Sequence, residues 1–402
     1  MSEDTAAFPK LLVATDFPPN IPGGGGAIVR QMLKDWPVNK IFWWSTTRDK
    51  NQFFGQNVAK HFVANIPPRL YPNKRGKILK NMFLETAWRP WAASHLRKTL
   101  ETVRPDVIWA IPHGWSIPPL ADALLRANVG LHFSIYDYPD NRSTIGRFGA
   151  NRCRQMAKQV DELYVRATTR DVISQQMMDD LQVRMGVPGA INRAGLESED
   201  FNYLQAEPKT QNKSIRIAYA GTIIAEETFA VFAKALAKLR GQLPLPLTLD
   251  FFGDHSYRSQ PWFNADWMIE HGSLNIQELG RALKECTWGF SPMELTDDNA
   301  RYNRFSLPTK VVSYLAAGLP VISLGHPEST IVKLASQYDV GICLAESNVD
   351  DLCLRLSSAL SEINPRTKFQ PGILRCASAE FDARSIRKTL YENFQKCASA
   401  FR

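Results

Sequence analysis

The sequence contains no long hydrophobic run and no grouped cysteines. No segment has 18 uninterrupted apolar residues, so the sequence predicts no membrane-spanning helix. The six cysteines are spread through the chain without C-x-x-C spacing, which argues against a zinc site or a disulfide framework. The N-terminus lacks a basic region followed by a long apolar stretch, so we expect a cytoplasmic protein without a secretory signal.

Length and charge narrow the possibilities further. A chain of 402 residues should form about two domains, because single cores rarely exceed about 250–300 residues. With 44% hydrophobic and 22% charged residues, the composition is that of a globular protein. The net charge of +8 indicates anionic partners, either a nucleoside diphosphate, an anionic membrane or nucleic acid. No recognisable nucleic-acid-binding module is present, so we do not expect a nucleic-acid partner.

Much of the positive charge is concentrated in one stretch. The stretch from Arg69 to Arg104 contains nine Lys and Arg residues but only two acidic residues, Glu85 and Glu101. One interpretation is an amphipathic cationic helix that makes a peripheral contact with anionic lipid at the inner face of the membrane and reaches a lipid-linked acceptor. The other is a helix that packs on the core and leaves a solvated, charged face.

Short apolar runs alternate with helical patterns in the first half of the chain. This alternation is typical of a doubly wound parallel sheet. We expect a long helix within residues 76–100 that is cut near Pro90, a further helix at 117–128 and another at 168–181. The strands expected here are Lys10–Thr15, Ile41–Trp44, Asp106–Ile111, Leu131–Tyr136 and Glu162–Ala167.

A second alternating series follows a polar segment, Glu197–Lys213, that we interpret as an interdomain linker. The expected strands of this half are 214–220, 247–253, 267–271, 287–292, 321–324 and 340–344, and the expected helices are 225–239, 276–284, 310–317, 348–362 and 383–397. The most informative stretch is Phe305–Ser323, which predicts a loop, a helix and a buried strand in succession. Pro308 suits a first helical turn, and Gly318 with Pro320 suits the helix end.

The loop before this helix is a plausible anion site. The N-terminus of a helix offers N–H groups without intrahelical partners and a positive dipole end. Thr309 and Lys310 add a hydroxyl group and a cation at that place. The stretch therefore predicts a seat for a diphosphate or a nucleotide.

The same stretch resembles the donor-binding segment of GT-B glycosyltransferases, particularly the retaining family 4. The family pattern is Pro-Ser/Thr-Lys-x-x-Glu-Tyr-x-Ala-x-Gly-x-Pro-Val-Ile. The matching residues are Pro308, Thr309, Lys310, Tyr314, Ala316, Gly318, Pro320, Val321 and Ile322. The glutamate of the pattern is Ser313 here, so the motif is degenerate at that position.

The N-terminal glycines add to the resemblance. No Lys-Ser/Thr follows Gly23–Gly26, so this is not a P-loop, and the glycines lie too far from the first strand for a dinucleotide-binding fingerprint. Gly24 and Gly25 resemble the family's glycine loop, in which the backbone approaches the donor phosphate and sugar. Asn192, Gly195 and Phe201 match the segment that closes the family's N-terminal domain.

The resemblance implies an α/β protein of the GT-B fold, with two Rossmann-like domains. The N-terminal, acceptor-side domain would comprise residues 1–200, and the nucleotide-sugar domain residues 201–382. The helix in residues 383–402 would cross back onto the N-terminal domain. The implied donor-site residues are Gly24, Gly25, Gly221, Thr222, Arg301, Arg304, Thr309, Lys310 and Ser313.

The sequence departs from the family where the donor is usually held. The family's Arg and Lys after the first C-terminal strand are absent from Gly221–Glu227, and its two glutamates are replaced by Phe305 and Ser313. Arg301 and Arg304, in a basic loop, could substitute as diphosphate ligands; otherwise they are solvated loop charges. No metal or other cofactor is expected, because cations and helix N-termini can neutralise a leaving diphosphate.

His113 and Asp137 follow strands of the first half, where ligands bind in open α/β sheets. Asp137 takes the place of the aspartate in the family's His-Asp pair, with Tyr136 instead of histidine. His113 would orient the sugar or acceptor, or else only cap a turn. The remaining histidines show no paired spacing for a metal.

Three functions remain open from the sequence. The first is a glycosyltransferase that moves a sugar from a nucleotide-sugar donor, with retention, to a glycan, lipid-linked or small-molecule acceptor in polysaccharide or glycoconjugate biosynthesis. The second is a GT-B protein that has lost transfer activity and serves as a binding or scaffold subunit. The third is a GT-B nucleotide-sugar epimerase, which needs more acid–base residues than this sequence offers.

Overall fold

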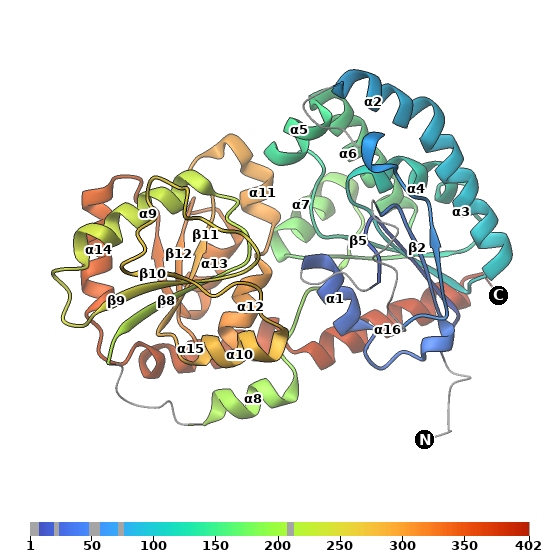
Figure 1. Cartoon of the computed structure of the whole chain (residues 1–402). Helices are drawn as coiled ribbons and strands as arrows, with labels where there is room; N and C mark the ends of the chain where they lie inside the picture. The colour runs from blue at the N-terminus through green and yellow to red at the C-terminus, as the bar shows by residue number, and fades with distance from the viewer. Residues whose placement is uncertain (1–7, 20–23, 48–56, 71–75, 207–212, 402) are drawn as a thin grey trace. The chain divides into compact units, whose positions relative to one another are not determined.

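The computed structural model describes residues 8–19, 24–47, 57–70, 76–206 and 213–401. The chain divides into two compact units: unit 1 is Met1–Ala194 with Arg384–Arg402, and unit 2 is Gly195–Ala383. Each unit contains one parallel sheet with helices packed against it (Figure 1). Among the helices of these described segments, none is long and apolar enough to cross a bilayer.

Unit 1 has a seven-stranded sheet in the order β3-β2-β1-β4-β5-β6-β7. Its first strand in sequence, β1, lies inside the sheet and is parallel to both β2 and β4. Every residue of β1, β4 and β5 is buried, as expected for strands covered by helices on both faces. The strands are β1 (Leu11–Thr15), β2 (Ile41–Ser45), β3 (Lys60–Val63), β4 (Val107–Ile111), β5 (Gly130–Ile135), β6 (Thr169–Val172) and β7 (Ala190–Ile191).

One strand predicted for unit 1 is a helix instead. Glu162–Ala167 lies almost wholly within the long helix α6, and the strand beside β5 begins only at Thr169. The buried side chains of α6 include Met156, Val160 and Leu163, which recur at helical spacing. The helices are α1 (Gly24–Met32), α2 (Lys77–Phe83), α3 (Arg89–Val103), α4 (Ile117–Leu124), α5 (Arg142–Phe148), α6 (Ala150–Arg166), α7 (Gln175–Met185) and α16 (Ala383–Ser399), with short helical turns at Val38–Lys40, Pro68–Leu70 and Gly114–Ser116.

The predicted break near Pro90 is also wrong. A π-helical turn, Leu84–Trp88, joins α2 directly to α3. Pro90 lies at the start of α3, where a proline without an N–H is tolerated because the wider turn replaces the ordinary hydrogen-bond ladder. The helix therefore continues through this position with one residue inserted.

The helix α16 belongs to unit 1, although it follows the whole of unit 2 in sequence. The hydroxyl group of Tyr391 donates to the carbonyl oxygen of Met32 over 3.0 Å, and the ring of Phe394 packs 5.3 Å from that of Trp109. A side chain at Gly130 would place its Cβ only 2.4 Å from the carbonyl oxygen of Cys397. The close approach of α16 to β5 therefore requires glycine at position 130.

Unit 2 has a six-stranded parallel sheet in the order β10-β9-β8-β11-β12-β13. Both sheets thus have the strand order of doubly wound folds, with the first strand inside the sheet and later strands added on both sides of it, which confirms the predicted fold class. The strands are β8 (Ile215–Ala220), β9 (Leu247–Phe252), β10 (Met268–Glu270), β11 (Trp288–Pro292), β12 (Val321–Leu324) and β13 (Gly341–Leu344).

Two segments of unit 2 are more helical than predicted. Part of the expected linker forms α8, while residues 207–212 of it lie outside the described residues, and the expected basic loop around Arg301 is largely the helix α11. The helices are α8 (Ser198–Gln205), α9 (Glu226–Leu239), α10 (Ile276–Lys284), α11 (Ala300–Phe305), α12 (Thr309–Ala316), α13 (Thr330–Tyr338), α14 (Val349–Leu360) and α15 (Pro365–Glu380), with a 3-10 turn at Asp297–Asn299.

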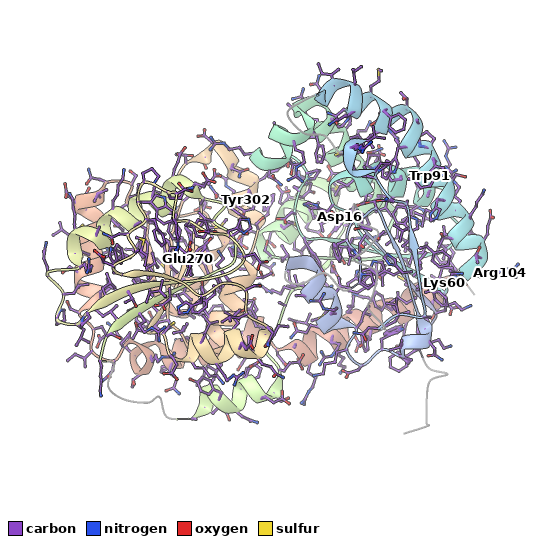
Figure 2. All side chains as sticks on the ribbon, viewed as in Figure 1. Asp16, Lys60, Trp91, Arg104, Glu270 and Tyr302 are labelled. Carbon is purple, nitrogen blue, oxygen red and sulfur yellow. The ribbon has the colours of Figure 1, made fainter. Side chains whose placement is uncertain are left out.

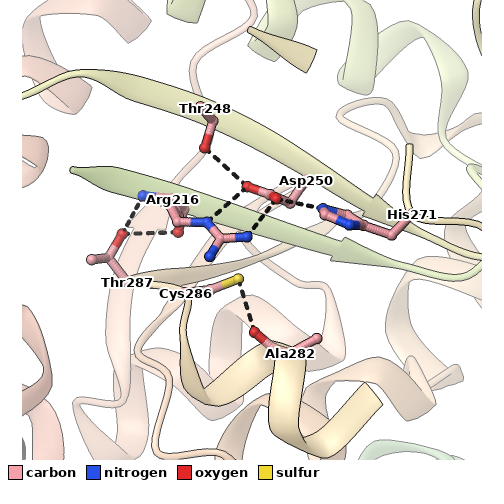
Figure 3. A network of polar contacts seen from close by, with 7 residues as sticks. All are labelled: Arg216, Thr248, Asp250, His271, Ala282, Cys286 and Thr287. Atoms are coloured by element: carbon pink, nitrogen blue, oxygen red, sulfur yellow. Dashed lines mark hydrogen bonds and ion pairs between the residues drawn. The ribbon is translucent and has the colours of Figure 1, made fainter. Parts of the chain in front are cut away.

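A buried carboxylate stabilises the β8–β9 side of this sheet (Figure 3). Asp250 is fully buried and accepts hydrogen bonds from Arg216 over 2.7 Å, from His271 over 2.6 Å and from Thr248 over 2.9 Å. Burial acts to raise the pKa of Asp250, but the donors from Arg216 and His271 outweigh it, and the net shift is downward. The carboxylate is therefore ionised in the folded protein and contributes to its stability.

We expect Asp250→Asn to lower the free energy of unfolding by about 2 kcal/mol at neutral pH. The amide NH₂ group of the asparagine would point at side chains that are themselves hydrogen-bond donors, and the negative charge would be lost. In the wild type, the stabilisation by the Asp250 carboxylate is fully present above about pH 3.9, the pKa of an aspartate in the unfolded chain. It is lost as the pH falls through the lower pKa that Asp250 has in the folded protein. Urea unfolding at neutral and acidic pH measures both effects. Asp266→Asn, at an exposed position, is the control; equal losses for the two variants would contradict the assignment.

Candidate active site

The loop that follows β8 is held in a fixed conformation. Gly221 has a φ of +91°, a conformation that favours glycine, and its N–H donates to the carbonyl oxygen of Phe252 over 2.7 Å. The hydroxyl group of Tyr219 donates to the carbonyl oxygen of Thr222 over 2.7 Å, and that of Tyr257 accepts from the N–H of Ile223 over 3.0 Å. Two tyrosines therefore shape the backbone at the carboxyl end of β8.

Tyr314 fixes the helix α12 to the same end of β8. Its hydroxyl group accepts from the N–H of Ala220 over 2.9 Å and donates to the carbonyl oxygen of Phe290 over 3.2 Å. A Cβ atom at Gly289 would lie 2.5 Å from the ring of Tyr314, so the absence of a side chain there makes room for the tyrosine. One helical turn separates Lys310 from Tyr314 on α12, so Tyr314 also sets the position of Lys310.

Lys310 is the candidate anion ligand of unit 2. Its Nζ lies 3.7 Å from the centroid of the Tyr219 ring, and burial lowers the pKa of this partly buried lysine to about 7. Among the residues that the structure describes, no carboxylate forms an ion pair with it. A desolvated cation without a counter-charge costs free energy, and an anionic ligand would remove that cost.

The other residues predicted on this helix lie around Lys310. Thr309 is exposed in the first turn, and Pro308 at the N-cap supplies no side-chain acceptor, so this helix end can receive an external anion. Ser313 lies three residues after Lys310 and hence on the same side of the helix, where it is partly buried. Thr222 Oγ1 is 3.2 Å from Nδ1 of His255.

Arg301 and Arg304 belong to α11 rather than to an open loop. Arg304 is exposed, and its Nη2 lies 4.0 Å from Oδ1 of Asp297, so its nearest described partner is a carboxylate. Tyr302, labelled in Figure 2, belongs to the same helix. Burial and the neighbouring phenols of Tyr314, Tyr257 and Tyr302 raise the pKa of Tyr219.

The tyrosines at positions 219, 257 and 302 were not predicted as site residues from the sequence. Tyr219 lies at the end of an apolar strand, where its ring could have been expected near the ligand-binding edge. No comparable local pattern marks Tyr257 or Tyr302. Tyr257 reaches the loop after β8 through a hydrogen bond between residues 34 positions apart in the sequence, which no local pattern could indicate.

In unit 1 the structure pairs His113 with an aspartate that the sequence did not single out. Asp16 follows β1 and His113 follows the neighbouring parallel strand β4, and Oδ2 of Asp16 lies 3.1 Å from Nδ1 of His113. Asp16, labelled in Figure 2, is the main cause that raises the pKa of His113 to about 9. Asp137 raises it further, while burial and Arg147 oppose the shift.

His113 is consequently an imidazolium ion near neutral pH. It can donate hydrogen bonds or stabilise negative charge, and it is not a general base in this state. Asp137 follows β5, so Asp16, His113 and Asp137 all come after strands of the same parallel sheet, at the carboxyl edge of β1, β4 and β5.

The glycines of α1 lie at the same edge of unit 1. Gly24 has a φ of +51° with open space beside its Cα, and a Cβ at Gly25 would lie 3.4 Å from Tyr136 and 3.5 Å from Phe17. Both glycines are in the first turn of α1, whereas Gly23 lies outside the described residues. The described part of the chain contains no group of three or more His, Cys, Asp or Glu that could hold a metal ion.

Comparison with known proteins assigns the architecture. No family model and no curated protein matches the sequence. Among solved structures, sucrose-phosphate synthase from Thermosynechococcus elongatus is similar with a TM-score of 0.70 and 12% identity over 97% of this chain and 100% of that one. HepE of Anabaena in complex with UDP has a TM-score of 0.66 and 13% identity over 96% and 99%.

A third similar structure is an α,α-trehalose-phosphate synthase (UDP-forming) from Burkholderia xenovorans, with a TM-score of 0.63 and 11% identity over 96% and 100% of the two chains. These proteins are GT-B glycosyltransferases. At such low identities the likeness shows the fold alone, and the chain has the GT-B fold.

Proposed function

We propose that this protein is a glycosyltransferase that transfers a sugar from a nucleoside diphosphate sugar to an acceptor hydroxyl group, with retention of configuration. The observation that carries the proposal is Lys310, a desolvated cation without a described counter-charge at the N-terminal turn of α12. A diphosphate supplies the charge that this position lacks. The acceptor would be a glycan, a lipid-linked sugar or a small molecule, and the reaction would belong to polysaccharide or glycoconjugate biosynthesis.

UDP is the first nucleotide to test. HepE has been crystallised with UDP and with UDP-glucose, and a trehalose-phosphate synthase of the same fold is UDP-forming. In our proposal Lys310 and the helix end with Thr309 neutralise the leaving diphosphate, without a metal ion. Gly221 and Thr222 border the donor, and Ser313 offers a hydroxyl group to it.

The residues of unit 1 would act on the sugar and acceptor. We propose that the imidazolium of His113, held by Asp16, donates a hydrogen bond to a sugar or acceptor oxygen. Asp137 would keep that cation in place, and Gly24 and Gly25 would let a ligand approach the backbone closely. Arg301 remains a proposed diphosphate ligand, whereas Arg304 would have to leave Asp297 to serve as one.

A thermal-shift screen with UDP, GDP, dTDP, CMP and UDP- and GDP-sugars tests the donor site. A ligand that binds only the native state raises the midpoint by mass action, and we expect the largest shift with UDP or a UDP-sugar. Release of UDP from the matching donor, measured with and without candidate acceptors, then tests the transfer. Absence of any shift would contradict the proposal.

A binding or scaffold role is the second candidate, and one observation favours it. Phe305 is buried and Ser313 carries no charge, so both positions at which the family has glutamates lack a carboxylate for the donor. This candidate predicts nucleotide binding, or none, without turnover of any nucleotide sugar.

The pKa of Lys310 predicts a pH dependence of donor binding. The free protein holds this amine at a pKa of about 7, whereas contact with a diphosphate raises it. Above pH 7 binding therefore takes up a proton, and we expect the affinity for UDP to fall by up to about tenfold per pH unit. Calorimetry from pH 6.5 to 9 in buffers of different ionisation enthalpy measures the proton uptake. Lys310→Met should make the affinity independent of pH in this range, and a flat wild-type profile would contradict the assignment.

A further inference from the structure

An apolar surface of unit 1 is exposed along the helix α2. Ile78 is 83% exposed, Leu79 67%, Met82 56% and Phe83 42%. Successive residues of a helix are rotated by about 100°, so these four side chains occupy one face about 140° wide. The buried residues Asn81 and Leu84 lie on the opposite side. The apolar face therefore points directly away from the protein.

The π-helical turn extends this face along α3. In an unbroken α-helix Trp91 would lie about 220° from Ile78, but the one extra residue of the turn returns it to about 120°, in line with Phe83. Trp91 is indeed 49% exposed, and Figure 2 shows it on α3.

The same face becomes basic in its second half. Counted through the π turn, Arg97 and Lys98 lie about 0° and 100° from Ile78, and both are exposed. Arg104, at the end of α3, is exposed as well, and Glu101 is the acidic residue among them. The outward face thus runs from four large apolar side chains and a tryptophan to a cluster with net positive charge.

Two other acidic groups nearby, Glu85 and Asp122, are only partly exposed and form ion pairs. Glu85 forms ion pairs with Arg89 and with Arg152, and Asp122 accepts from Arg89 over 2.7 Å. The outward charge is therefore largely positive, which is complementary to anionic lipid headgroups. Lys74 and Arg75 of the basic stretch lie outside the described residues.

We propose that this face lies on the surface of an anionic lipid bilayer, with Ile78, Leu79, Met82, Phe83 and Trp91 in the interfacial layer and Arg97 and Lys98 at the headgroups. Exposed apolar side chains with flanking cations are the pattern of helices that lie in a membrane interface. The inner side of the same helix packs against the turn that follows His113: the ring of buried Trp88, in the π turn, lies 6.2 Å from that of Trp115.

If the protein is the glycosyltransferase proposed above, this placement also implies that the acceptor is carried by a lipid. This implication rests on the proposed function. An enzyme held on the bilayer at the His113 side meets a lipid-linked sugar by diffusion in two dimensions. The surface itself is independent of the donor site, because Lys310 belongs to unit 2.

Vesicle co-sedimentation with the full chain tests the surface. We expect binding to phosphatidylcholine vesicles that contain phosphatidylglycerol, and much weaker binding to pure phosphatidylcholine. Ile78→Ser with Phe83→Ser should weaken binding to the anionic vesicles by about 30-fold or more. Arg97→Gln with Lys98→Gln should weaken it by about tenfold and make it less dependent on salt.

Val183→Ser with Leu354→Ser is the matched control, since Val183 and Leu354 are 85% and 75% exposed elsewhere on the chain. Unchanged vesicle binding by this control supports the proposal. Equal loss in the control, or no binding by the wild type, overturns it. Self-association of the wild type that the Ile78/Phe83 variant abolishes, without vesicle binding, would assign the face to a second copy instead. The UDP thermal shift, measured on every variant, tests the donor site separately.

Discussion

Replacing Lys310 with alanine should weaken the binding of UDP by about 10- to 150-fold without unfolding the protein. The amine would make a charge-assisted contact with the diphosphate, and such contacts contribute about 1.5–3 kcal/mol. Because burial already lowers the pKa of Lys310, removal of the amine relieves a desolvation cost in the free protein. The thermal midpoint without ligand should therefore stay level or rise, while the shift caused by a given UDP concentration becomes smaller.

Lys284→Ala is a closely matched control for this experiment. Nζ of Lys284 lies 3.7 Å from the centroid of the Tyr203 ring, the same cation–π distance as between Lys310 and Tyr219, and both pairs belong to unit 2. We expect the control variant to bind UDP as the wild type does. Equal UDP affinity in the Lys310 variant would remove the central assignment of the donor site.

Replacing Arg366 with alanine should lower the free energy of unfolding of unit 2 by about 3–5 kcal/mol. Its guanidinium donates to the carbonyl oxygens of Ala317, Lys284 and Cys286 over 2.7–2.8 Å, with longer contacts to Leu283 and Gly318. These carbonyls stand at the ends of α10 and α12, where helices lack intrahelical donors. Loss of the arginine leaves several of them unsatisfied at once.

Arg375→Ala separates this effect from the loss of any arginine on α15. Arg375 is exposed and donates to one helix-end carbonyl, that of Tyr338, over 3.2 Å, so we expect a cost below about 1 kcal/mol. Urea unfolding gives the stabilities, and hydrogen exchange shows whether α10 and α12 open together in the Arg366 variant. A loss as small as that of the control would show that water satisfies the carbonyls instead.

Much of the fold could be predicted because its signals are local. Apolar strands such as β1 and β4 are bounded by helices with clear apolar faces, and this alternation is sufficient for a doubly wound sheet. The error at Glu162–Ala167 has a physical cause. Leu163, Tyr164 and Val165 are adjacent apolar residues, as in a buried strand, yet Leu163 and Tyr164 are buried while Val165 is 50% exposed on α6.

The residues of the candidate site also fall into two groups, those indicated by local sequence and those brought together only by the fold. Lys310 could be predicted because the loop, the helix start and the family pattern that indicate it lie within one short stretch of sequence. The partner of His113 was missed because Asp16 is 97 residues away in sequence, and only the pairing of β1 with β4 brings the two together. The loop around Arg301 was expected to be irregular, since a six-residue helix carries too few residues to show a period.

The position of α16 has a consequence for how the chain is made. A ribosome delivers the strands of unit 1 first, then all of unit 2, and only afterwards the helix whose Phe394 covers Trp109 and whose Tyr391 bonds to Met32. Until α16 has been synthesised, part of the apolar surface of the first sheet remains exposed to solvent, whereas unit 2 can already have folded. The N-terminal half of this protein is therefore the last to mature, and a nascent chain arrested before residue 383 would present an unfinished surface to chaperones and proteases.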